Sequence, residues 1–128
     1  MNTTIVVAVT DIFFYTKVRD ALRPQGYTLE RIRNQDEVAE KMTSTQPAAL
    51  ILNMNDLAVD AFKALETIQN NPALRSLPIL AFANHEEVDT WRRAKELGVT
   101  KVVSRNEFSA RTKDLVEELI HAQPAGQS

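Results

Sequence analysis

Polar and charged side chains that could do chemistry stand directly after four apolar runs of the chain. They fall at positions 9–11, 53–56, 83–85 and 104–106, and the only carboxylates among them are Asp11 and Asp56. Carboxylates are the nucleophiles that form acyl phosphates, and Mg²⁺ prefers anionic oxygen ligands. Asp56 is therefore a candidate phosphoacceptor or metal ligand, and Asp11 is a candidate metal ligand. Each also stands where Asp commonly caps a helix, and the cap is the interpretation we favour for both.

Other kinds of site chemistry lack the residues they need. The chain has no cysteine, which excludes disulfides, thiolate metal sites and cysteine nucleophiles. His85 and His121 are isolated in the sequence, fit no metal-ligand spacing, and are expected on the surface or in loops. No Ser-His-Asp arrangement is convincingly placed. We therefore expect no catalytic residue, no metal and no cofactor.

Length and composition indicate one ordinary domain. The chain has 128 residues, of which 44% are hydrophobic and 25% charged, and its net charge is −2. This charge is too small to favour nucleic acid or an anionic membrane as a partner. The apolar run 5–9 is far shorter than the roughly 20 residues of a membrane helix. These observations predict a cytoplasmic protein that contacts neither nucleic acid nor membrane.

Short apolar runs alternate with stretches of helical periodicity. Strands are expected at 5–9, 28–32, 48–52, 79–83 and 101–104. Runs that are apolar at every position are typical of strands covered by helices on both faces, whereas the alternation in 28–32 favours an edge strand. This rhythm predicts a doubly wound α/β fold with a parallel sheet, whose site lies at the carboxyl ends of the strands.

The helices expected between these strands have recognisable start and stop signals. The signals are Asp11 or Thr10 as first cap, Pro24–Gly26 as its stop, Asn34 with Glu37 as a capping box, Asp56 as third cap, Gly98 as the stop of a helix at about 86–97, and Ser109 as last cap. Residues 1–121 are expected to form the domain, and 122–128 a flexible tail.

Three stretches of the sequence resemble the receiver domain of two-component response regulators. They are PAALILN at 47–53, NPALR at 71–75 followed by LPIL at 77–80, and AKELGV at 94–99. The resemblance runs from about Thr4 to Ile120. It implies a flavodoxin-like sheet of five parallel strands in the order 2-1-3-4-5, with five helices, and a role in signal transduction.

The same resemblance implies that the phosphorylation site is degenerate. Thr10 and Asp11 stand where receivers have an acidic pair that holds a divalent cation, Asn53 stands at the phosphoacceptor, Ala83 at a hydroxyl residue, and Arg105 at a lysine. An amide oxygen is a very poor nucleophile, and losing acids weakens Mg²⁺ binding. We therefore expect a pseudo-receiver that is not an enzyme and acts independently of phosphorylation.

Two further expectations concern charge and partners. Arg105 either pairs with Asp11 or Asp56 in the pocket or is simply solvated. Trp91, Lys95 and Val102 lie where receivers often contact partners, although Trp91 is equally compatible with the core. The expected partner is a signalling protein or a fused output domain, and a homodimer is a further option.

The rival function is that of a small flavodoxin-like ligand-binding or enzymatic α/β domain. Loops that cradle phosphate need glycine for close backbone approach. The glycines are Gly26, Gly98 and Gly126, and none follows the runs 5–9, 48–52 or 79–83. The sequence therefore favours the signalling module over this rival.

Overall fold

The computed structural model describes residues 3–121, and the tail predicted at 122–128 lies outside the described residues. Its five strands form one parallel sheet in the order β2-β1-β3-β4-β5, which confirms the expected topology and the edge position of β2. The strands are β1 (Thr4–Ala8), β2 (Thr28–Arg31), β3 (Ala49–Asn53), β4 (Ile79–Ala83) and β5 (Lys101–Ser104). Every residue of β3 and β4 is buried, as a strand covered on both faces requires.

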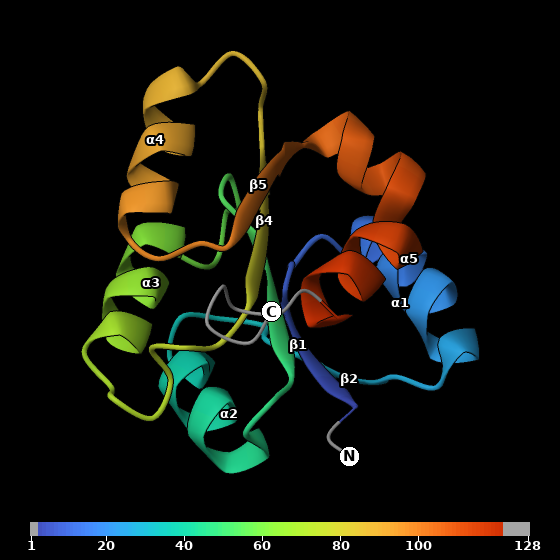
Figure 1. The fold of residues 1–128 in the computed structure, drawn as a ribbon, viewed down its shortest axis with the longest axis horizontal. Coiled ribbons are helices and arrows are strands. Elements are labelled where there is room, and N and C mark those ends of the chain that lie inside the picture. The colour runs from blue at the N-terminus through green and yellow to red at the C-terminus, as the bar shows by residue number, and fades with distance from the viewer. Residues whose placement is uncertain (1–2, 122–128) are drawn as a thin grey trace.

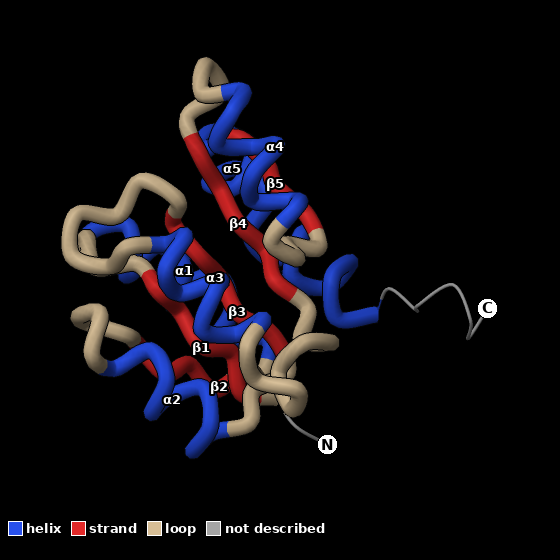
Figure 2. Tube along the Cα trace, turned by 90° about the vertical axis from the view of Figure 1, so that its left-hand side faces the viewer, coloured by secondary structure: helices blue, strands red, loops and turns tan. Residues whose placement is uncertain are grey.

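Five α-helices cover the two faces of the sheet. They are α1 (Ile12–Leu22), α2 (Glu37–Thr45), α3 (Ala61–Gln69), α4 (Val88–Glu96) and α5 (Arg105–His121), with a 3₁₀ turn η1 (Arg23–Gln25) after α1. Helices α1 and α5 lie on one face, and α2, α3 and α4 lie on the other (Figure 1). The tube in Figure 2 shows the strands running side by side between these layers. Within residues 3–121, no helix is long and apolar enough to cross a membrane.

Each face of the sheet contributes to its own hydrophobic cluster. The cluster under α2, α3 and α4 includes Met42, Leu65 and Ile68, and all three are fully or almost fully buried. On the opposite face the rings of Phe14, Phe82 and Phe108 stack, with centroids 4.5 to 5.7 Å apart. This aromatic stack fixes the starts of α1 and α5 against β4 and so positions the carboxyl edge of the sheet.

Two predicted helix signals are confirmed. The Asp11 side chain accepts hydrogen bonds from the backbone N–H groups of Phe13 and Phe14, at 2.9 and 3.2 Å, and caps α1. Gly98 follows α4 with a φ of +98°. The N–H of Gly98 donates to the Lys95 carbonyl, and that of Val99 donates to the Ala94 carbonyl. These two bonds form a Schellman stop.

Three predicted helix starts are wrong. Asp36, rather than Asn34, is the residue before α2, and it makes no side-chain capping bond. Helix α5 begins at Arg105, because the Ser104 hydroxyl accepts from the Glu107 N–H directly after β5. The hydroxyl of Ser109 instead accepts from Lys17 Nζ.

The third wrong start concerns Asp56. Helix α3 begins at Ala61, and its cap is Asp60, whose side chain accepts from the Lys63 N–H. Asp56 lies within the loop before α3, where its carboxylate is engaged by Thr10. The predicted cap role of Asp56 was therefore wrong.

Candidate functional site

The candidate site is a depression of about 530 Å³ at the carboxyl edge of the sheet. It lies between the loop after β1, the loop after β3 and the first residue of α5. Its lining residues are Thr10, Asp11, Asn53, Asn55, Asp56, Leu57 and Arg105. The structure thus brings together five residues singled out from the sequence. Ala83 ends the neighbouring strand β4 and is buried, but it does not line the depression.

Asn53 is the last residue of β3, a strand in which every residue is buried. Only 3% of its surface is exposed, although it carries a polar amide. Its Oδ1 accepts a hydrogen bond of 2.9 Å from the N–H of Asn55. The amide oxygen therefore stabilises the turn that follows β3.

Asp56 links the loop after β1 to the loop after β3. Its Oδ2 accepts from the Thr10 N–H at 2.8 Å, and its Oδ1 accepts from the Thr10 hydroxyl at 2.7 Å. Oδ1 also accepts from the N–H groups of Ala58 and Val59, at 2.9 and 3.1 Å. Both carboxylate oxygens are thus committed to the protein itself.

A second link joins the loop after β3 to the loop after β4. The N–H of Asn84 donates to Asn55 Oδ1 at 3.1 Å. The amide groups of Asn55 and Asn84 donate to the two carboxylate oxygens of Glu87, at 2.9 and 3.1 Å. These bonds, with one from Thr90, lower the pKa of Glu87 below its ordinary value, the Asn55 bond contributing most. Trp91 Nε1 donates to the Asn84 carbonyl at 3.0 Å and so fastens the same loop to α4.

Sequence reasoning missed Asn55 and Glu87 as members of the site. One signal was available, because Asn84 and Glu87 are three residues apart, as in a capping box, although Glu87 is here the residue directly before α4. The contribution of Asn55 comes from another loop, 29 positions away from Asn84 in the sequence. It follows from the strand order, which places the loops after β3 and β4 side by side.

Arg105 lines the depression and forms no ion pair with any residue of 3–121. Its guanidinium carbon is 4.9 Å from the ring centre of Phe14 and 5.4 Å from that of Phe82. Among residues 3–121, neither Asp11 nor Asp56 forms a salt bridge with it, so the ion pair, one of the two alternatives left open for Arg105, is not formed. The reason is that both acids already accept backbone N–H groups, while the aromatic faces attract the cation.

The residues present do not fit a divalent cation. Within the part of the chain that the structure describes, no group of three or more acidic or histidine side chains could hold a metal ion. Both oxygens of Asp56 are occupied by hydrogen bonds, and Asp11 uses one oxygen to cap α1. Mg²⁺ requires several hard oxygen ligands in octahedral geometry, which this site does not offer.

The three residues expected at a partner surface differ in exposure. Val102 is only 9% exposed and belongs to the core, so it offers almost no contact area. Trp91 is half-buried and packs against the same core. Lys95 is exposed, and its Nζ donates to the Thr100 carbonyl at 3.5 Å.

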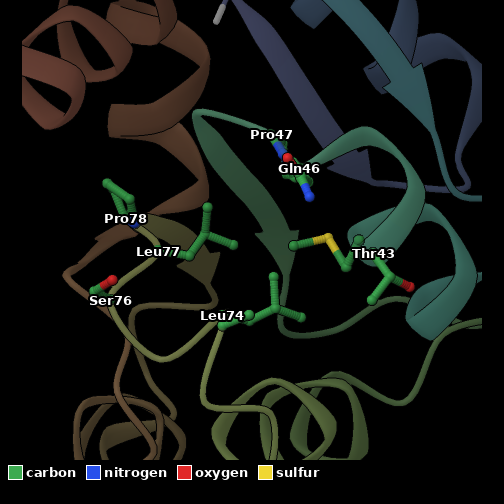
Figure 3. Close-up of a pocket in the computed structure, with 9 residues that line it drawn as sticks. Thr43, Gln46, Pro47, Leu74, Ser76, Leu77 and Pro78 are labelled. Atoms are coloured by element: carbon green, nitrogen blue, oxygen red, sulfur yellow. The ribbon is translucent and has the colours of Figure 1, made fainter.

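A second depression lies at the opposite, amino edge of the sheet, between α2 and the connection from α3 to β4. Its volume is about 480 Å³, and it is lined mainly by apolar side chains, among which Leu74 and Leu77 converge in Figure 3. Thr43, Gln46 and Ser76 are its polar lining residues, and none is ionisable. This depression therefore offers no group for acid–base or metal chemistry.

Comparison with solved structures identifies the fold. The structure is similar to a response regulator from Chloroflexus aurantiacus J-10-fl described as putative (TM-score 0.83, 18% identity, covering 94% of this chain and 98% of that chain). It is also similar to the phosphorylated cyanobacterial phytochrome response regulator RcpA (TM-score 0.83, 14% identity, 97% and 98%). A third similar structure is the receiver domain of a sensor histidine kinase from Pseudomonas aeruginosa PAO1, with magnesium in its active-site cleft (TM-score 0.81, 14% identity, 95% and 100%).

No family model and no curated protein matches the sequence. The structural similarity, at these low identities, shows that the chain has the receiver fold.

Proposed function

We propose that this chain is a phosphorylation-independent, receiver-like signalling module that acts through protein–protein interaction in the cytoplasm. Its partner is a signalling protein or an output domain fused to it. The observation that carries the proposal is the pair of hydrogen-bonded links around Asn53, through Asp56 on one side and Glu87 on the other.

The chemistry of Asn53 argues against a phosphoryl switch. An acyl phosphate forms only on a carboxylate, and Asn53 carries an amide whose oxygen already accepts the Asn55 N–H. Asp56 is the nearest acid in sequence, yet both of its oxygens hold the loops together. Ala83, at the end of β4, has no hydroxyl with which to bind a phosphoryl group.

The loop contacts support a surface that is fixed without modification. In receivers, as the resemblance implies, a hydroxyl after the fourth strand follows the phosphoryl group. In this chain the corresponding loop is bound to its neighbour through Asn55, Asn84 and Glu87. These contacts use only groups of the protein itself, so the loops need no phosphoryl group to stay joined.

The proposal is tested by incubating the whole chain with acetyl phosphate and Mg²⁺ and measuring its intact mass. A phosphorylatable receiver domain serves as the positive control. We expect no phosphoryl adduct on this chain. An adduct that disappears in Asp56→Asn or Asp11→Asn would contradict the proposal.

The variant Asn53→Asp tests whether a carboxylate at position 53 is sufficient for phosphorylation when the acidic pair and the hydroxyl at position 83 are still missing. Restoring this carboxylate alone leaves the cation without its acidic pair and leaves Ala83 in place. We expect Asn53→Asp to gain no adduct under conditions that phosphorylate the control completely. A complete adduct on Asn53→Asp would contradict the expectation that the site is degenerate beyond Asn53.

A further inference from the structure

The large hydrophobic side chains that are exposed within residues 3–121 gather at one edge of the sheet. They are Ile12, Phe13, Leu57 and Val88, with exposed fractions of 51%, 83%, 102% and 70%. Ile12 and Phe13 begin α1, Leu57 lies in the loop after β3, and Val88 begins α4. All four therefore belong to the carboxyl edge, where the candidate site lies.

Exposed apolar side chains that gather in one region mark an interaction site more often than chance exposure does. Leu57 lines both the candidate site and a neighbouring depression before α3, so it separates the two depressions. Strands β1, β3 and β4 are consecutive in the sheet, so the loop after β3, which carries Leu57, lies between the loops that lead into α1 and α4.

The charge of the same edge decides the chemistry of the partner. The loops 9–11, 54–60 and 84–87 contain neither Lys nor Arg, and their acids are Asp11, Asp56, Asp60, Glu86 and Glu87. Two cations lie beside these loops: Arg31, whose guanidinium donates to the Thr10 carbonyl at 2.8 Å, and Arg105, which is held over the rings of Phe14 and Phe82. The five acids of the loops outnumber them. A second copy of this chain would bring an equally acidic edge, and like charges at an interface oppose association.

We infer that the edge surface formed by Ile12, Phe13, Leu57 and Val88 binds a protein segment whose apolar side chains are flanked by Lys or Arg. The apolar side chains of the partner segment pack on the edge surface and bury it. The Lys or Arg side chains of the segment pair with the acids around that surface. This inference names the partner chemistry of the proposed module and so rests on the proposed function.

The test uses the whole chain and a helical peptide of about 15 residues with leucines on one face and lysines beside them. Fluorescence anisotropy measures binding without Mg²⁺ or a phosphoryl donor, and amide NMR locates the contact. We expect shifts at residues 12, 13, 57 and 88, and weaker binding at high salt. Leu57→Ser should weaken binding about tenfold, because it removes a central apolar anchor. Its side chain is fully exposed, so this variant keeps the fold.

Matched controls separate the contribution of charge complementarity from nonspecific hydrophobic binding. A peptide with Glu in place of Lys should bind far more weakly, and Glu86→Gln should lower affinity while Glu66→Gln on α3 should not. Equal binding of both peptides, or self-association that Leu57→Ser abolishes, would overturn the inference. Absence of binding overturns the inference and leaves the proposed function standing, whereas binding that requires Mg²⁺ and acetyl phosphate overturns the proposed function.

Discussion

The carboxylate of Asp56 accepts four hydrogen bonds from two loops that are 46 positions apart in the sequence. Its removal leaves the Thr10 hydroxyl and three N–H groups without their acceptor. An unsatisfied, partly buried donor costs about 1–3 kcal/mol. At the scale of single residues, Asp56 is thus the side chain on which the shape of the site depends most.

We predict that Asp56→Ala lowers the free energy of unfolding by about 2–3 kcal/mol. Asp56→Asn should cost less, because it keeps one acceptor oxygen. Asp60→Ala, which removes the single bond that caps α3, should cost about 1 kcal/mol. Urea unfolding of the three variants measures this order. An Asp56→Ala variant as stable as the wild type would show that the Thr10 link is unimportant.

The guanidinium of Arg105 lies over the rings of Phe14 and Phe82. A cation over two rings contributes about 0.5–2 kcal/mol. In double-mutant cycles, Arg105→Ala should couple to Phe14→Leu by at least about 0.5 kcal/mol, and to Asp11→Asn by less than about 0.3 kcal/mol. Stronger coupling to Asp11→Asn than to Phe14→Leu would indicate that Arg105 pairs with Asp11 rather than with the aromatic rings.

At the scale of elements, the loops after β1, β3 and β4 are joined in series by Thr10–Asp56 and by Asn55–Asn84–Glu87. The second link is charge-assisted, since Glu87 accepts as a carboxylate. Its pKa is lowered in the folded chain by the Asn55 and Asn84 bonds. The link is therefore complete above the ordinary carboxyl pKa of 4.5 and is lost as the pH falls through the lower, folded value.

We predict that wild-type stability falls with pH below about 4.5 and that Glu87→Gln, which cannot titrate, falls less steeply over that range. Glu66→Gln is the matched control on an exposed helix face. Thermal unfolding of both proteins, at intervals of about one pH unit between pH 3 and 7, measures the difference in their pH dependence. Parallel curves for wild type and Glu87→Gln would show that the carboxylate does not hold the loop.

Some helix and strand bounds could be predicted from the sequence, and others could not. Strands β3 and β4 were predicted to within one residue, because fully apolar runs bounded by Pro47, Asn53 and Pro78 leave little choice. The start of α3 was not, since Asp56 and Asp60 both precede an apolar periodic stretch. Contact with Thr10, distant in sequence, decides between them.

The candidate site was predictable in position but not in its contacts. The rule that ligands bind at the carboxyl ends of parallel strands located Thr10, Asn53 and Arg105 correctly. Neither alternative considered for Arg105 included its contact with aromatic rings, because the aromatic stack that attracts it combines α1, β4 and α5. Such contacts follow from packing between elements, which local sequence patterns do not contain.

At the scale of the whole molecule, the receiver fold carries an edge whose loops are joined by the protein's own side chains. The same edge presents Phe13 and Leu57 to solvent. A surface that is ordered before binding loses less conformational entropy when a partner docks. We therefore propose one constant docking surface at this edge rather than a switch.

The most direct test of this central claim is the amide NMR spectrum of the whole chain before and after adding beryllofluoride with Mg²⁺, a mimic of the phosphorylated state. We predict no shifts beyond the effect of ionic strength, because Asn53 carries no carboxylate and both oxygens of Asp56 accept hydrogen bonds from the protein itself. Saturable shifts clustered at Asn53, Asp56 and Ala83, with the loop after β4 following them, would contradict it.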